Sequence, residues 1–153
     1  MQRETTIDAP EAATAPPGPA PERTAASGWV LRGVTTAYLV AGFAQPVFAG
    51  VYLSGDFDGL AWHVRGADLV SYIAIAHLGA AAAVWVRGRR AWPFWSSLAL
   101  VAGVTAQYFA GTGGALWLHF PLGAALVAGI AGAFAAVWRR PLPRRAKEVR
   151  ADG

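Results

Sequence analysis

Four long apolar runs dominate the chain and limit what it can fold into. They cover approximately residues 33–54, 63–86, 93–112 and 117–138, and most charged residues lie outside them. A helix rises about 1.5 Å per residue, so it needs about 20 apolar residues to cross a hydrocarbon core about 30 Å thick. Only 14% of the residues are charged, against about a quarter in soluble domains. The pattern therefore predicts an all-α fold, a four-helix transmembrane bundle in a lipid bilayer.

The segments that flank the four runs have a different composition. Residues 1–28 are rich in proline and alanine and hold almost no large apolar side chains, which is typical of a disordered tail. Residues 139–153 are basic, and we expect them to be disordered as well. The predicted organisation is a tail over 1–28, a bundle over 29–138 and a basic tail over 139–153.

The arginines predict how the bundle is oriented. The loop after the second run carries Arg87, Arg89 and Arg90, and the C-terminal tail carries five more arginines and Lys147, whereas the other two loops carry none. Positive loops stay on the cytoplasmic side. We therefore expect a multi-pass protein of the inner or plasma membrane with both termini in the cytoplasm. We expect the basic tail to lie against anionic lipid headgroups. We do not expect a nucleic-acid partner.

The two halves of the chain resemble each other. The segment 44–50 (AQPVFAG) matches 106–111 (AQYFAG), and 60–63 (LAWH) matches 116–119 (LWLH), in the same order. We interpret this as two parallel-repeated helical hairpins, related by a pseudo-twofold axis along the membrane normal. The repeat places His63 and His119 at equivalent positions.

This symmetric pair of histidines suggests a haem site. A b-type haem between helices needs two imidazoles that face each other across the iron and small residues that admit the macrocycle. Gly66 follows His63 by one helical turn, and Gly123 follows His119. Arg65 is a candidate partner for the haem propionates. The predicted cofactor is thus haem b, with His63 and His119 as the metal ligands.

With these residues the chain resembles membrane b-type cytochromes and, more loosely, one half of haem A synthase, a helical protein built by duplication with paired histidines. The element Leu-x-x-His-x-Pro-Leu-Gly at 116–123 is also similar to one in a family of small four-span bacterial membrane proteins, to which no activity is attached. The resemblance covers about residues 33–138. It implies electron transfer through haem and a membrane redox partner.

The remaining polar residues within the runs favour structural roles. We expect His77 to be buried and bonded to a neighbouring helix, at Tyr38 or Thr36, because the position equivalent to it in the second half is Ala133. Arg65 is expected to pair with Asp68, three residues further along one helical face.

Other roles remain open for some of these residues. Asp68 is alternatively a proton-accepting carboxylate near the outer surface. Gln45 and Gln107 are expected to form interhelical hydrogen bonds. Small residues in the fourth run, such as Gly129 and Gly132, suit close helix packing within the bundle or in a homo-oligomer.

Several function classes find no support in the sequence. The chain has no cysteine, which excludes disulfides, zinc–thiolate sites and iron–sulfur clusters. No nucleophile-elbow or phosphate-loop motif is present, so we assign no catalytic residues and do not expect an enzyme. The alternative to a haem protein is a non-enzymatic accessory or assembly subunit without a cofactor. A small transporter or channel is a third possibility that the scarcity of charges disfavours.

Overall fold

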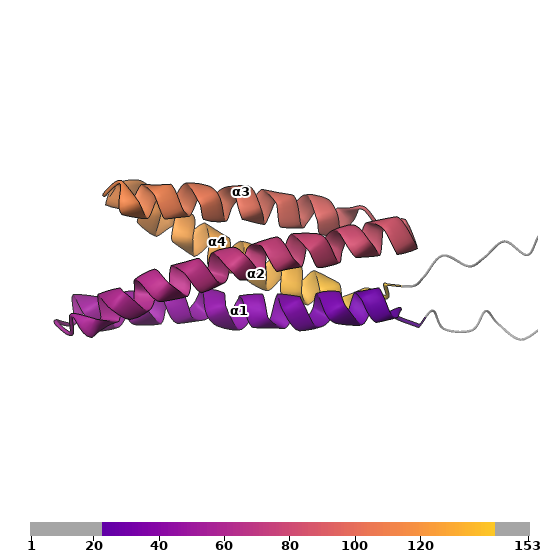
Figure 1. Ribbon diagram of the computed structural model, residues 1–153, viewed down its shortest axis with the longest axis horizontal. Helices are drawn as coiled ribbons and strands as arrows, with labels where there is room; N and C mark the ends of the chain where they lie inside the picture. Colours follow the sequence, from indigo (N-terminus) through magenta and orange to yellow (C-terminus); the bar gives the residue numbers. More distant parts are fainter. Residues whose placement is uncertain (1–22, 143–153) are drawn as a thin grey trace, which may run out of the picture.

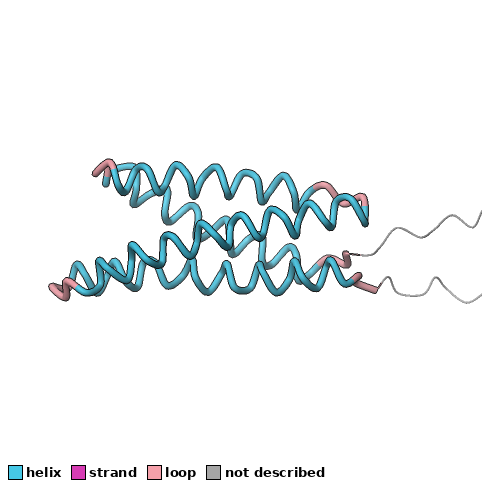
Figure 2. Tube along the Cα trace, viewed as in Figure 1, coloured by secondary structure: helices cyan, strands magenta, loops and turns pink. Residues whose placement is uncertain are grey.

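The computed structural model describes residues 23–142, and within that range it contains four α-helices and no strand (Figure 1). Short connections of three or four residues, at 54–57, 89–91 and 113–115, join them (Figure 2). The helices are α1 (Ala26–Leu53), α2 (Asp58–Gly88), α3 (Trp92–Thr112) and α4 (Leu116–Arg139).

The helices form a four-helix bundle in which each one packs against two neighbours. The packed pairs are α1 with α2, α2 with α3, α3 with α4 and α4 with α1, and among the described residues the two diagonal pairs make no close backbone approach. The connections 54–57 and 113–115 lie at the left-hand end of Figure 1, which we call the turn end. The start of α1, the end of α4 and the connection 89–91 lie at the opposite end, which we call the terminal end.

The exterior of the bundle is apolar, which is consistent with a membrane protein. Helices α1, α2 and α4 are each long and apolar enough to cross a bilayer. Helix α3 has the length for it but a lower hydropathy, with polar side chains that include Ser96, Ser97 and Gln107. Large apolar side chains point outward on all four helices, including Val40, Val47, Tyr72, Ile75, Phe109 and Phe120.

Two apolar clusters hold the interior of the bundle together. One lies in the middle and combines residues from all four helices: Tyr38, Val70, Ala74, Leu100, Val104, Ile130 and Ala133. The other belongs to the terminal end: Leu31, Ala81, Val84, Val137 and Leu142. These clusters leave the region near the turn end without a comparable apolar core.

The ordered structure extends beyond the predicted limits of the bundle. Helix α1 already begins at Ala26, and the chain after α4 folds back over the start of α1. The backbone N–H of Ala25 donates to the carbonyl of Leu142 at 2.9 Å, and the Leu142 side chain is only 1% exposed. Residues 23–28 and 139–142, which fall in the predicted tails, thus belong to the described structure, whereas residues 1–22 and 143–153 lie outside it.

Arg32 closes the terminal end of the bundle. Its guanidinium donates to the carbonyl oxygens of Val137 at 3.2 Å and of Arg140 at 3.3 Å, and it lies 4.8 Å from the ring centroid of Trp29 and 5.2 Å from that of Trp138. The last carbonyls of a helix have no intrahelical donor, and a positive charge is favourable there. Arg32 therefore caps the end of α4.

Candidate functional site

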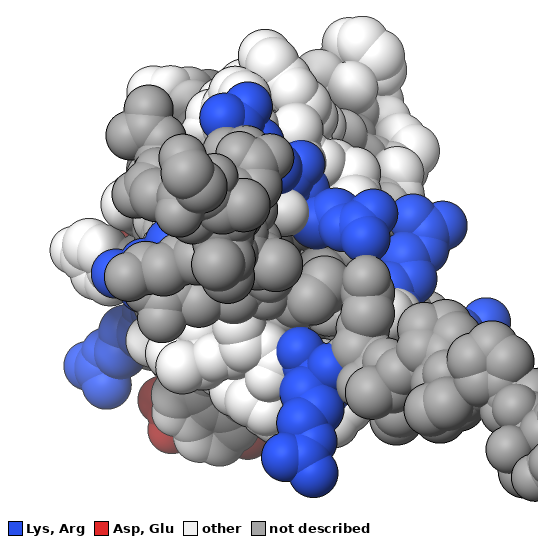
Figure 3. All heavy atoms as spheres, turned by 90° about the vertical axis from the view of Figure 1, so that its right-hand side faces the viewer, with Lys and Arg blue, Asp and Glu red and all other residues white. Residues whose placement is uncertain are grey.

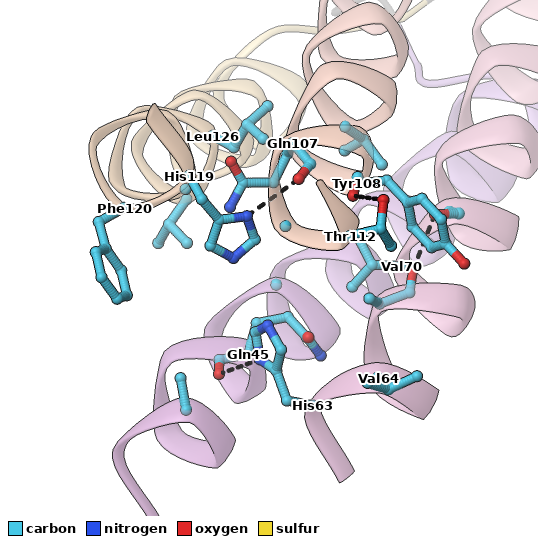
Figure 4. A pocket seen from close by; sticks show the side chains of 18 of the residues that line it. Gln45, His63, Val64, Val70, Gln107, Tyr108, Thr112, His119, Phe120 and Leu126 are labelled. Carbon is cyan, nitrogen blue, oxygen red and sulfur yellow. Dashed lines mark hydrogen bonds between the residues drawn. The ribbon is translucent and has the colours of Figure 1, made fainter. Parts of the chain in front are cut away.

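A cavity of about 360 Å³ lies between the four helices toward the turn end (Figure 4). Most of its wall is apolar, and its inner end is formed by Gly42, Val70, Val104 and Ile130. The polar side chains that line it come from every helix: Gln45, Tyr52, His63, Ser71, Gln107, Tyr108, Thr112 and His119. An apolar pocket with a few convergent polar groups is the usual form of a ligand site.

The two predicted ligand histidines are held by equivalent hydrogen bonds. Nδ1 of His63 lies 3.1 Å from the carbonyl oxygen of Gln45, and Nδ1 of His119 lies 3.1 Å from that of Gln107. A carbonyl oxygen only accepts, so each Nδ1 carries the hydrogen, and Nε2 of a neutral ring keeps its lone pair. Both rings are thereby prepared in the tautomer that ligates a metal through Nε2.

The two rings face each other across the cavity. Their centroids are 6.0 Å apart and their planes meet at 74°. Figure 4 shows that the nitrogen of each ring that is not bonded to a carbonyl points toward the other ring. Two lone pairs in this arrangement repel each other unless an electron-pair acceptor, a metal ion or a proton, lies between them.

Glycines allow the helices to approach closely at the level of the histidines. A Cβ on Gly111 would lie 2.8 Å from the His119 ring, and one on Gly123 would lie 2.8 Å from Nε2 of Gln107. In the other hairpin, a Cβ on Gly66 would collide with the side-chain amide of Gln45. The two predicted glycines thus face the glutamine side chains, and only Gly123 lines the cavity itself.

The two glutamines position the histidines through their main chain. The predicted side-chain hydrogen bonds between helices are not present, since Oε1 of both residues is buried without a partner among the described residues. Any residue type supplies a main-chain carbonyl, so the residue type alone does not predict this role. The recurrence of the same residue at matched positions was the only available signal.

Arg65 lies outside the cavity, contrary to its predicted role. It is exposed and does not line the cavity, because a residue two positions after His63 points about 200° away from it around the helix. The predicted ion pair with Asp68 does not form within the described part of the chain. The polar groups nearest the turn end of the cavity are instead Tyr52 and Thr112.

His77 is engaged in a hydrogen-bond network of its own. Its Nε2 lies 3.0 Å from Oγ1 of Thr35, and its Nδ1 lies 2.8 Å from Oγ of Ser97. The Thr35 hydroxyl donates to the carbonyl of Leu31 at 2.6 Å, so it accepts from His77 Nε2–H, and Ser97 donates to Nδ1. Both ring nitrogens are occupied and the residue is 1% exposed, so it is not available as a ligand in this arrangement.

The prediction for His77 was right about burial and wrong about the partners. The bonds go to Thr35 of α1 and Ser97 of α3. Tyr38 contacts the imidazole only through its ring, with the centroids 5.6 Å apart. Thr36 donates instead to the carbonyl of Arg32 within its own helix.

No cluster of three or more histidine, cysteine, aspartate or glutamate residues occurs within 23–142. His63 and His119 have no third potential metal ligand of these types grouped with them in the described part of the chain.

Comparisons of the chain with protein-family models, with curated proteins and with solved structures found no match. A function for this chain is therefore inferred from the geometry of the cavity.

Proposed function

We propose that this chain is a membrane electron-transfer protein that binds a b-type haem between His63 and His119. The separation of the two rings carries this proposal. Bonds of about 2.0 Å from a metal to two imidazole nitrogens on opposite sides place the ring centroids about 6 Å apart, and the observed separation is 6.0 Å. Bound haem supplies a one-electron change at its iron.

The residues of the chain would orient the two ligands and keep the site dry. The carbonyls of Gln45 and Gln107 hold the rings in the tautomer with a free Nε2. A hydrogen bond from Nδ1–H to a carbonyl also increases the basicity of an imidazole ligand at Nε2. The apolar inner end of the cavity, at Val70, Val104 and Ile130, excludes water and suits the apolar edge of a macrocycle. Tyr52 and Thr112 offer hydroxyl groups to its propionate edge.

The equivalent contacts in the two hairpins support the predicted internal repeat. Each histidine bonds to the carbonyl of the matched glutamine, at the same distance of 3.1 Å. Each glutamine side chain in turn faces a glycine of the following helix, at Gly66 or Gly123. A pseudo-twofold axis between the hairpins accounts for all of these pairs and brings two ligands to one metal at equal depth.

The same proposal includes four membrane crossings. Helix α2 ends at the terminal end, whereas α4 begins at the turn end, so α3 has to cross the bilayer if both of its neighbours do. Described arginines gather at the terminal end (Figure 3), which favours a cytoplasmic location for that end. The haem would then lie near the outer face of the membrane.

Haem content in single variants tests the proposal. His63→Ala and His119→Ala should each reduce the haem bound per chain at least tenfold, since either change leaves one axial ligand. His77→Ala is the matched control within the bundle and should retain haem. The proposal fails if the two ligand variants retain as much haem as the wild type. Wild-type protein without haem, from cells supplied with a haem precursor, would favour the accessory subunit.

A further inference from the structure

Charge is separated along the axis of the bundle. Among residues 23–142 the carboxylates are Asp56, Asp58 and Asp68, which lie at the turn end or in the half of α2 next to it. Exposed arginines occupy the terminal end (Figure 3): Arg23, Arg87, Arg89, Arg90, Arg139 and Arg140. The terminal end is therefore strongly positive, with no described carboxylate near it.

One of these arginines lies over a tryptophan, and another belongs to the connection that precedes the same tryptophan. The guanidinium of Arg140, after α4, lies 5.2 Å from the ring centroid of Trp92 at the start of α3. The carbonyl of Arg140 accepts a hydrogen bond from Arg32, so both its main chain and its side chain are fixed. Arg89 lies three residues before Trp92 and has a φ of 54°, a left-handed conformation that is uncommon for residues other than glycine.

The length of the helices places these arginines at the depth of the lipid headgroups. Helix α2 has 31 residues and is therefore about 46 Å long, whereas the hydrocarbon core is about 30 Å thick. Exposed tryptophans, which prefer the headgroup region, occur at the same end: Trp29, Trp85, Trp95 and Trp138. The ends of the helices thus reach the layer where the phosphates of the lipids lie.

We infer that Arg140, which lies over Trp92, and Arg89, in the connection that leads to Trp92, bind the phosphate of an anionic phospholipid. A guanidinium offers two parallel N–H donors to phosphate oxygens. A zwitterionic lipid brings a compensating amine to the same phosphate, so an anionic headgroup is preferred. A lipid bound here would connect the α2–α3 connection to the end of α4, and so the two hairpins to each other. The inference does not depend on whether haem is bound.

Lipid retention by the purified full-length chain tests this inference. We would use mixed micelles of phosphatidylglycerol and phosphatidylcholine and count retained lipids by native mass spectrometry. Arg89→Gln and Arg140→Gln should each reduce the preference for phosphatidylglycerol roughly fivefold. Arg65→Gln removes the same charge from the opposite half of α2 and should leave the preference unchanged.

Two results would overturn the inference. One is an unchanged preference in the double variant Arg89→Gln/Arg140→Gln, and the other is an equal loss in Arg65→Gln. If the double variant does not fold, the salt dependence of the wild type is the second measurement. The preference should fall as salt rises from about 0.1 to 1 M, because screening weakens exposed charge pairs, and a preference insensitive to salt would contradict a phosphate site.

Discussion

The hydrogen bond between each site histidine and a main-chain carbonyl determines what its ring can do. It fixes the hydrogen on Nδ1 of His63 and His119 and leaves Nε2 of each free toward the cavity. His77 has no such freedom, because Thr35 and Ser97 occupy both of its nitrogens. Three histidines in one bundle are thus divided between a candidate ligand pair and a structural residue.

The sequence allowed this division to be predicted in part. The repeat paired His63 with His119 and left His77 without a counterpart, and the structure brings the first two together and buries the third. The sequence did not reveal the carbonyl partners of His63 and His119, since these depend on how the helices are rotated and not on residue type. Arg65 does not line the cavity, because closeness in sequence to His63 does not place a residue on the same helical face.

Replacing Gly66 tests the close approach of α1 and α2 beside His63. Gly66→Ala should lower the free energy of unfolding by about 1–3 kcal/mol, because the new Cβ overlaps the amide of Gln45. Gly79→Ala in the same helix is the control, since no atom lies within 4 Å of a Cβ there. Titration of the detergent-solubilised protein with a denaturing detergent measures both values. Equal stability of the two variants would show that the contact does not matter.

Two adjacent serines, Ser96 and Ser97, allow the contribution of the His77 network to stability to be compared with that of a hydrogen bond within one helix. Ser97→Ala should cost about 1 kcal/mol of stability, because it leaves Nδ1 of His77 buried without a donor. Ser96→Ala should cost less, since Ser96 only donates to the carbonyl of Pro93 in its own helix. The same denaturation experiment compares them, and a larger loss for Ser96→Ala would refute the network.

At the scale of elements, hydropathy located all four helices but not their full lengths. All four helices begin before their apolar runs, most clearly at Ala26 and at Asp58, and α2 and α4 also end beyond them. An apolar run marks only the part of a helix that suits the hydrocarbon core, whereas the helix continues into the headgroup layer. His63 consequently lies in the second turn of α2, deeper in the bundle than the first residue of an apolar run suggests.

Arg32 shows how an element can depend on one side chain whose contacts the sequence does not reveal. An arginine beside a tryptophan at the start of an apolar run is typical of an interfacial anchor, but here it binds the carbonyls at the end of α4. Nothing local in the sequence indicates a contact with residues more than a hundred positions away.

Arg32→Gln should therefore destabilise the bundle. We expect a loss of about 2–3 kcal/mol, because the charge-assisted bonds to the end of α4 disappear and buried carbonyls lose their donor. Arg23→Gln, at an exposed position before α1, should change stability by less than about 0.5 kcal/mol. Comparable losses in the two variants would mean that the cap contributes little.

At the scale of the whole molecule, the bundle is closed at one end and hollow at the other. The terminal end is closed by Arg32, Leu142 and their apolar neighbours, whereas the turn end holds the cavity between the two hairpins. The sequence predicted the order of the helices and the ends at which the charges lie. The cavity depends on how the hairpins pack, which hydropathy does not encode.

The absence of cysteine from the sequence makes the orientation of the bundle directly measurable. We expect Ser54→Cys and Gly113→Cys, in the connections at the turn end, to react with a membrane-impermeant thiol reagent on intact cells. Ala26→Cys, at the start of α1, should react only after the cells are opened. The reverse labelling pattern would contradict cytoplasmic termini and would move the proposed haem to the inner face.

The absorption spectrum of the detergent-purified wild-type chain, air-oxidised and then reduced with dithionite, tests the central claim most directly. Two imidazole ligands on one iron predict a sharp Soret band and separate α and β bands that appear on reduction. A spectrum without these bands, from cells supplied with a haem precursor, would contradict a haem between His63 and His119.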